Sequence, residues 1–250
     1  MSRTQKGHAR PQPTVQPQGL GRLTLAGIVH RDPAGADRLW DFLERCRPGG
    51  VSVELSRYSL AFRRSNRERL ARTLDENLEV IMREDTDGRE TFLSESGHVY
   101  AIRAAIGVPY EYEVCSTYCR RHGAPLELAD LSSSSRTHLP ALEELISLPN
   151  LRRLLAEPDE DPREEATRQR RVAEGLLLRT PLESARWPHP QDPEDWLREE
   201  HMARTIRRAI SQNGDCQWVH VVGWQHLLWI DDRQTLYTRL LEYDPKRVIV

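Results

Sequence analysis

The sequence predicts an α/β protein with a mixed, mostly parallel β-sheet flanked by helices and a largely helical central section. Three observations support this fold class. Short apolar runs near the two ends of the chain, at residues 23–26 and 218–222, have the length of buried strands. Segments with helical periodicity alternate with such runs, which is typical of parallel sheets. The 250 residues, of which 38% are hydrophobic, suffice to bury one large core.

The first predicted unit is a strand, a helix and a second strand. The strand at 23–26 precedes Asp32 and Pro33, which resemble the N-cap and first residue of a helix. Apolar residues spaced three and four apart continue that helix to the Pro-Gly-Gly sequence at 48–50. A strand at 51–55 follows, so we expect two parallel neighbouring strands joined by a right-handed crossover.

The middle of the chain is predicted to be mostly helical. A long helix rich in arginine and glutamate is expected over 58–82, and a second helical region over about 99–122. A short strand should follow at 126–128, and the serines at 132–135 are interpreted as a loop without the context of a catalytic serine. The charged stretch 157–171 is predicted to be an exposed connector or helix rim.

The last third of the chain contains stronger signals. Asp192 and Pro193 indicate the start of a helix that continues past Ile210. A strand over 217–222 comes next, and Asp231 with Gln234 resembles a capping box for the final helix. Residues 247–250 could add one more strand.

Composition limits the partners and the compartment. The formal net charge is −2, from 36 basic and 38 acidic residues, which gives no support for a nucleic-acid or membrane partner. The four cysteines are scattered, as in a reducing compartment, and Cys115 and Cys119 are interpreted as buried helix residues. Without a secretory signal or an apolar run of about 18 residues, we expect a soluble, cytoplasmic protein.

The domain organisation is predicted to be simple. Residues 1–19 are rich in proline, glutamine and charge, so we expect a disordered leader. Residues 20–250 should form a single α/β domain. The sequence leaves the oligomeric state open, and a homodimer is one option.

A repeated motif carries the functional prediction. Gly27 to His30 and Gly223 to His226 both read Gly-x-x-His at the end of an apolar run. Each histidine should lie just past the carboxyl end of a strand, where open α/β sheets usually bind ligands. We therefore expect the two imidazoles to lie close together, at one edge of the sheet.

Two charged residues join this prediction. Glu54 should lie at the same edge as His30, where a carboxylate needs a cation, a metal or a hydrogen-bond donor, unless it is simply solvated. Arg57 is a candidate ion-pair partner. Arg198 shares the core-facing side of its helix with Met202, so it either reaches out to solvent or holds an anion in a cleft.

These residues together resemble the TraB family, which includes pheromone-shutdown and GumN proteins and is related to Tiki metalloproteases and, distantly, to erythromycin esterases. The resemblance spans about Leu20 to Leu241. It rests on the paired Gly-x-x-His motifs, on Val53-Glu54-Leu55, on Arg198-Glu199-Glu200-His201-Met202-Ala203, and on the strand segment His122 to Asp130.

The resemblance implies an EreA/ChaN-like core and a hydrolase of peptides or small esters. It implies a metallopeptidase-like site in which His30, His226 and Glu54 bind one divalent transition metal, manganese, cobalt or zinc, and activate a water. Arg198 would orient a substrate carboxylate or stabilise the oxyanion. Two alternatives stay open: a metal-free esterase-like hydrolase using the same histidines and glutamate as bases, and a non-catalytic regulatory protein that binds a peptide or ligand.

The sequence also departs from the family's pattern. Leu131 replaces the arginine that usually follows the central aspartate, and Glu199 is a longer acid than the residue usual after Arg198. Trp224 and Gln225 replace small residues and should narrow the pocket beside His226.

Overall fold

The computed structural model describes residues 21–84, 96–177, 182, 193–214, 216–230 and 233–250. The predicted leader at 1–19, Asp192 of the predicted helix start and Asp231 of the predicted capping box lie outside these residues.

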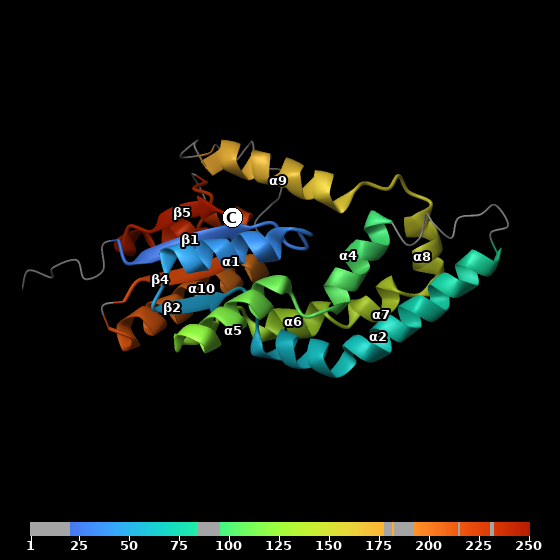
Figure 1. Cartoon of the computed structure of the whole chain (residues 1–250), viewed down its shortest axis with the longest axis horizontal. Coiled ribbons are helices and arrows are strands. Elements are labelled where there is room, and N and C mark those ends of the chain that lie inside the picture. The colour runs from blue at the N-terminus through green and yellow to red at the C-terminus, as the bar shows by residue number, and fades with distance from the viewer. Residues whose placement is uncertain (1–20, 85–95, 178–181, 183–192, 215, 231–232) are drawn as a thin grey trace, which may run out of the picture.

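A five-stranded sheet forms the centre of the molecule (Figure 1), and all of its pairings are parallel. The α/β class is therefore confirmed, and the antiparallel pairing implied by a mixed sheet is not found among the described strands. The strands, in sheet order, are β3 (Leu126–Leu128), β2 (Gly50–Val53), β4 (Trp218–Gly223), β1 (Leu23–Ile28) and β5 (Lys246–Ile249).

The expectation that the first two strands are neighbours is wrong. β4, from the far end of the sequence, lies between them and pairs with both, so that Val221 is in register with Ala26 on one side and Val53 on the other. This insertion brings the carboxyl ends of β1, β2 and β4 together. It is the topological reason why loops more than 160 residues apart in sequence meet at one edge, as the Glu54 and Gly223 contact shows.

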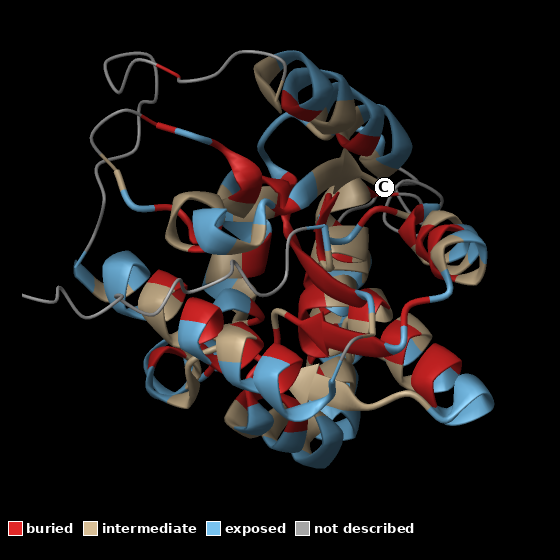
Figure 2. Cartoon of the chain, turned by 90° about the vertical axis from the view of Figure 1, so that its left-hand side faces the viewer, coloured by how far each residue is buried: buried red, intermediate tan, exposed pale blue. Residues whose placement is uncertain are grey.

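Helices cover both faces of the sheet. α1 (Gly35–Cys46) and α5 (Tyr110–His122) pack on one face with a shared apolar core, in which Cys115 and Cys119 are buried as predicted. α10 (Pro193–Gln212) and α11 (Leu236–Arg239) pack on the other face. The three central strands β2, β4 and β1 are consequently buried on both sides, whereas the outer surfaces of the helices are exposed (Figure 2).

A separate helical section lies beyond the carboxyl edge of the sheet (Figure 1). It comprises α2 (Arg57–Glu84), α4 (Gly97–Ile106), α6 (Ser132–His138), α7 (Ala141–Leu145) and α8 (Leu148–Leu155), and α2, α4 and α8 share their own apolar core. The loop predicted at Ser132–Ser135 is wrong, because these serines form the first turn of α6 and Ser135 Oγ lies 2.7 Å from Ser56 Oγ.

The remaining elements border the same edge. α9 (Pro162–Leu177), which contains much of the predicted charged stretch, packs its buried alanines near Val29 and Trp224. The 3₁₀ helices η2 (Trp224–Leu227) and η3 (Leu241–Tyr243) complete the described part of the chain. Among the described helices, none is long and apolar enough to cross a membrane.

The start of α1 also differs from the prediction. Asp32 is not its N-cap, because the helix begins at Gly35 and Ala34 occupies the cap position. The Asp32 carboxylate instead accepts a hydrogen bond from Ala34 N at 2.9 Å, forming a turn before the helix. Gly35 is required here, since a Cβ would lie 2.4 Å from the ring of Tyr110.

Candidate active site

The glycines of the repeated motif permit close approach between the two loops. Neither Gly27 nor Gly223 has a positive φ, so neither is needed for a left-handed turn. A Cβ on Gly27 would lie 3.1 Å from Trp224 Cα, and a Cβ on Gly223 would lie 2.8 Å from His30 Nε2. Each glycine thus makes room for the loop that carries the histidine of the other motif.

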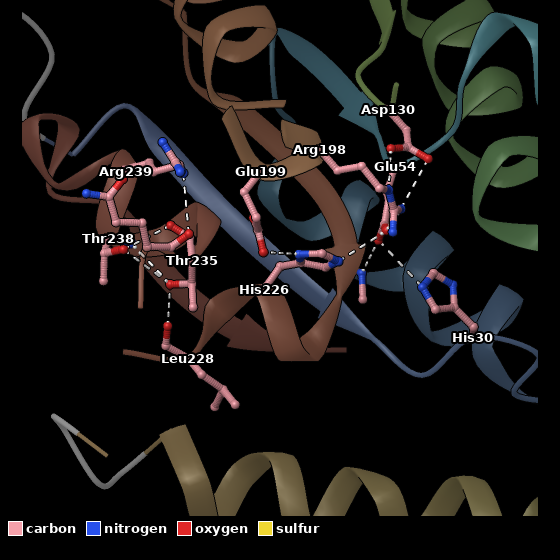
Figure 3. A network of polar contacts seen from close by, with 12 residues as sticks. His30, Glu54, Asp130, Arg198, Glu199, His226, Leu228, Thr235, Thr238 and Arg239 are labelled. Atoms are coloured by element: carbon pink, nitrogen blue, oxygen red, sulfur yellow. Dashed lines mark hydrogen bonds and ion pairs between the residues drawn. The ribbon is translucent and has the colours of Figure 1, made fainter. Parts of the chain in front are cut away.

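Glu54 is the centre of the site, as Figure 3 shows. It follows β2 directly, and its side chain is only 8% exposed. Oε2 accepts a hydrogen bond from Gly223 N at 2.8 Å and lies 3.5 Å from His30 Nε2. Oε1 accepts from Arg198 Nη2 at 2.8 Å and lies 3.2 Å from His226 Nε2. The solvated alternative for Glu54 is therefore wrong.

His226 is held on both ring nitrogens. It lies in η2, with Nδ1 2.7 Å from Glu199 Oε1 and Nε2 facing Glu54. Its side chain is 18% exposed, and that of Glu199 is 9% exposed. The longer acid after Arg198 is thus the partner that fixes the ring of His226.

His30 is held on one nitrogen only. Nδ1 lies 2.9 Å from Oε1 of Glu111, a buried residue in the first turn of α5. Nε2 is farther from Glu54 than a normal hydrogen bond, and the side chain is 44% exposed. His30 reaches Glu54 from the opposite side to His226 (Figure 3), and it is the more accessible of the two rings.

Arg198 links two carboxylates. Its Nε donates to Asp130 Oδ1 at 3.0 Å and its Nη2 donates to Asp130 Oδ2 and to Glu54 Oε1. The solvent-directed alternative for Arg198 is wrong, and the ion-pair partner of Glu54 is Arg198 rather than Arg57. Asp130 also accepts from the backbone of Leu131, the position at which the family usually has an arginine.

The charges of this network perturb its acids and bases strongly. Burial by itself would raise the pKa of Glu54, but the charge and hydrogen bond of His226, together with the nearby charge of His30, hold it well below 4.5. Burial would lower the pKa of both histidines, whereas Glu111 and Glu54 raise that of His30, and Glu199 and Glu54 raise that of His226 well above 6.5. The network therefore favours the ionised form of Glu54 and the protonated form of His226.

A cavity of about 480 Å³ opens beside this network, between the sheet edge and the helical section. This is the size of a small-molecule site. His30, Glu54, Arg198 and Asp130 line it, whereas His226 is not part of its wall. A ligand in the cavity would thus meet His30 first.

The predicted metal ligands His30, His226 and Glu54 come together, but their donors are already engaged. Arg198 and Gly223 each donate to one oxygen of Glu54, and an ion there would lie beside the guanidinium. No group of three or more His, Cys, Asp or Glu side chains within the described residues is arranged to hold a metal ion. The geometry fits a hydrogen-bonded site better than a metal centre, and the metal stays a prediction.

Sequence reasoning did not nominate Glu111 or Asp130 as site residues. Glu111 lies in the first turn of α5, where acidic residues are common because they interact favourably with the helix dipole. Its position in the sequence therefore did not distinguish it from an ordinary helix-start residue. Asp130 ends the segment after β3, and its position past a strand's carboxyl end was a usable signal.

Comparison of the chain with protein-family models, with curated proteins and with solved structures found no match. The resemblance to the TraB family therefore stays a prediction from the motifs.

Proposed function

We propose that the protein is a hydrolase of small esters or peptides in which His30 activates a water molecule. The observation that carries this proposal is the setting of His30. One nitrogen is fixed by a buried carboxylate, while the other lies 3.5 Å from Glu54 Oε2, farther than a normal hydrogen bond, and the ring borders the cavity. This is how an imidazole is prepared for general base catalysis.

The reaction would proceed as follows. His30 takes a proton from water, and the hydroxide adds to the substrate carbonyl carbon. The bond from that carbon to the ester oxygen or amide nitrogen then breaks, and His30 returns the proton to the leaving group. Glu54 and Glu111 stabilise the imidazolium formed in between. Arg198 Nη1, which has no hydrogen-bond partner among the described residues, can donate to the developing oxyanion.

Membership of the TraB family, with an EreA/ChaN-like core, is part of the same proposal. It is supported by the four motif residues His30, Glu54, Arg198 and His226, which meet around one carboxylate although they come from four segments of the chain. A metallopeptidase of the Tiki type is the second candidate, because both Nε2 atoms face Glu54, as two metal-binding imidazoles would.

The test is hydrolysis by the purified full chain of p-nitrophenyl esters and of a peptide library. Each assay is run after EDTA treatment and again with manganese, cobalt or zinc added. Hydrolysis that survives EDTA and is lost in His30→Gln supports the metal-free mechanism. Hydrolysis that needs an added ion, with about one bound per chain, supports the metallopeptidase. Substrate binding without turnover under all conditions would reject both in favour of a binding protein.

A further inference from the structure

Arg63 is a cation held in the cavity wall by neutral groups. It lies in α2, where its Nε donates to Ser59 Oγ at 3.2 Å and its Nη1 donates to the carbonyl oxygens of Ala105 and Gly107. These carbonyls end α4, and a helix carboxyl end favours positive charge. The guanidinium is thus fixed in orientation without a hydrogen-bonded carboxylate.

Its remaining nitrogen is available to a ligand. Arg63 Nη2 has no hydrogen-bond partner among the described residues, and it is not one of their fully buried, unsatisfied polar atoms. Arg63 lines the same cavity as His30. Burial and the nearby charge of Arg31 lower the pKa of Arg63, whereas the charge of Glu111 opposes this shift.

Arg31 adds a second positive charge to this wall. It follows His30 directly, is exposed, lines the cavity, and forms no hydrogen bond or ion pair with the described residues. Its φ is +63°, which lies in the left-handed helical region. This conformation costs a non-glycine residue about 1–2 kcal/mol relative to the right-handed one. Backbone conformations of this kind are concentrated at ligand-binding and active sites.

The acids that line the cavity do not neutralise these two arginines. Asp32 pairs with Arg38, Glu111 with His30, and both Glu54 and Asp130 with Arg198. Every one of these carboxylates therefore has a cation or imidazole bound to it. The two arginines are left as positive charges facing one space, where they favour the binding of an anion.

We propose that Arg31 and Arg63 form an anion-binding subsite that takes the free carboxylate of the ligand, next to His30. The ligand class is a small organic acid or a monoester or peptide of one, with its carboxylate a few bonds from the carbonyl that reaches His30. That this ligand is a substrate rests on the proposed function, whereas the subsite itself does not.

The experiment is calorimetric titration of the full-length protein with glutarate, a small dicarboxylate, and with glutaramide, its neutral analogue. Wild type should bind glutarate and not glutaramide. Arg31→Gly should weaken glutarate binding about tenfold, the effect of one charged hydrogen bond, because glycine keeps the left-handed backbone while removing the guanidinium.

Arg47→Gly is the matched control. Arg47 is also an exposed arginine with positive φ, at +45°, but it caps the carboxyl end of α1 and does not line the cavity. Its replacement should leave glutarate affinity unchanged. Arg63→Met is the second variant and should weaken binding at least as much as Arg31→Gly, with folding checked by circular dichroism.

Several results would overturn the subsite. The first is that wild type does not bind glutarate. The second is that Arg31→Gly and Arg47→Gly bind glutarate with equal affinity, and the third is that wild type binds glutaramide as tightly as glutarate. Inorganic phosphate is titrated in parallel. If the protein bound phosphate more than tenfold more tightly than glutarate, the subsite would be assigned to a phosphate group and the proposed carboxylate would be rejected. Arginine-dependent glutarate binding without hydrolysis of any ester would support the subsite and reject the proposed hydrolase, and hydrolysis of neutral esters without glutarate binding would do the reverse.

Discussion

At the scale of single residues, the two histidines of the repeated motif are not equivalent. His30 borders the cavity with one nitrogen held, whereas His226 has both nitrogens held and does not line the cavity. The repeat in sequence suggested two equal partners, but the surroundings assign them different tasks. We interpret His30 as the reacting group and His226 as the group that positions Glu54.

Glutamine variants separate these two tasks. His30→Gln keeps a donor for Glu111 but removes the base, so the rate constant kcat should fall about 10²- to 10⁴-fold. His226→Gln keeps one amide donor, for either Glu54 or Glu199, so kcat should fall by only about tenfold. The measurement is kcat and KM for one ester with both proteins at equal purity. A larger loss in His226→Gln than in His30→Gln would contradict the assignment.

Gly223 gives a steric test of the same geometry. In Gly223→Ala the new Cβ would lie 2.8 Å from His30 Nε2, closer than real contacts allow, so either the ring or the loop must move. We expect at least a tenfold loss in kcat, since displacements of about 1 Å cost this much or more. Gly175→Ala in α9 is the control, because no atom within 4 Å meets its Cβ. It should keep activity and gain up to about 1 kcal/mol of stability. Wild-type kcat in Gly223→Ala would show that His30 does not act from this position.

Residue-level prediction worked where chemistry and position coincided. Glu54 stood near the carboxyl end of a predicted strand and both histidines just past one, so a shared edge followed from the fold class. Arg198 could be placed on the inner face of its helix but not assigned a partner, because Asp130 and Glu54 are 68 and 144 residues away in sequence. Glu111 is likewise 81 residues from His30, and no periodicity reports such a contact.

At the scale of elements, strand positions were more predictable than strand order. The strand at Leu126–Leu128 and the last strand were located to within about one residue, because short apolar runs fix strand existence. Apolar periodicity contains no information on which strands pair. The insertion of β4 between β1 and β2 was therefore missed, although the site depends on it.

A buried polar contact joins β2 and β4 and tests this pairing. Ser52 Oγ accepts from Trp218 Nε1 at 3.0 Å and lies 2.9 Å from Nδ1 of His220, which is fully buried. Burial lowers the pKa of His220 to about 3, so the ring is neutral and Ser52 can donate to Nδ1. Its Nε2 has no partner among the described residues, which leaves the ring dependent on this serine.

Ser52→Ala should destabilise the protein by about 2 kcal/mol, because two buried polar groups lose their partner. The measurement is urea unfolding followed by circular dichroism, with Ser133→Ala as the control, since Ser133 is exposed on α6. The control should change stability by less than about 0.5 kcal/mol. Equal stability of the two variants would show that the contact between the strands contributes nothing.

At the scale of the whole molecule, the charge network links the sheet edge to helices on both faces, and its titration should control the rate. The base form of His30 is required, and Glu111 and Glu54 raise the pKa of His30 above 6.5, towards about 10, against the effect of burial. The partly exposed ring is screened by solvent, which reduces this shift. The rate kcat/KM should therefore rise with pH above 6.5. A rate that falls over this range would identify His30 as a general acid instead.

The same network should make stability depend on pH at both ends of the range. Because the pKa of His226 is raised in the folded state, its contribution is fully present below the unfolded value of 6.5 and is lost as pH rises through the folded value. Glu54 has a lowered pKa, so its contribution is present above 4.5 and is lost as pH falls through the folded value. The contribution of this network to stability should thus be greatest between about pH 5 and 6.5.

Subtraction isolates this contribution from the other ionisable groups of the chain. The melting temperature Tm of wild type minus that of His226→Gln should be nearly constant from pH 5 to 6.5 and should shrink by about 5 °C as pH rises to 9. Because glutamine does not titrate, the variant keeps its neutral hydrogen bonds at every pH. A difference in Tm that stays constant up to pH 9 would mean that His226 is neutral in the folded protein. Glu54 would then be held by Arg198 and the backbone of Gly223 alone, and the acid limb of the profile would persist while the alkaline limb disappeared.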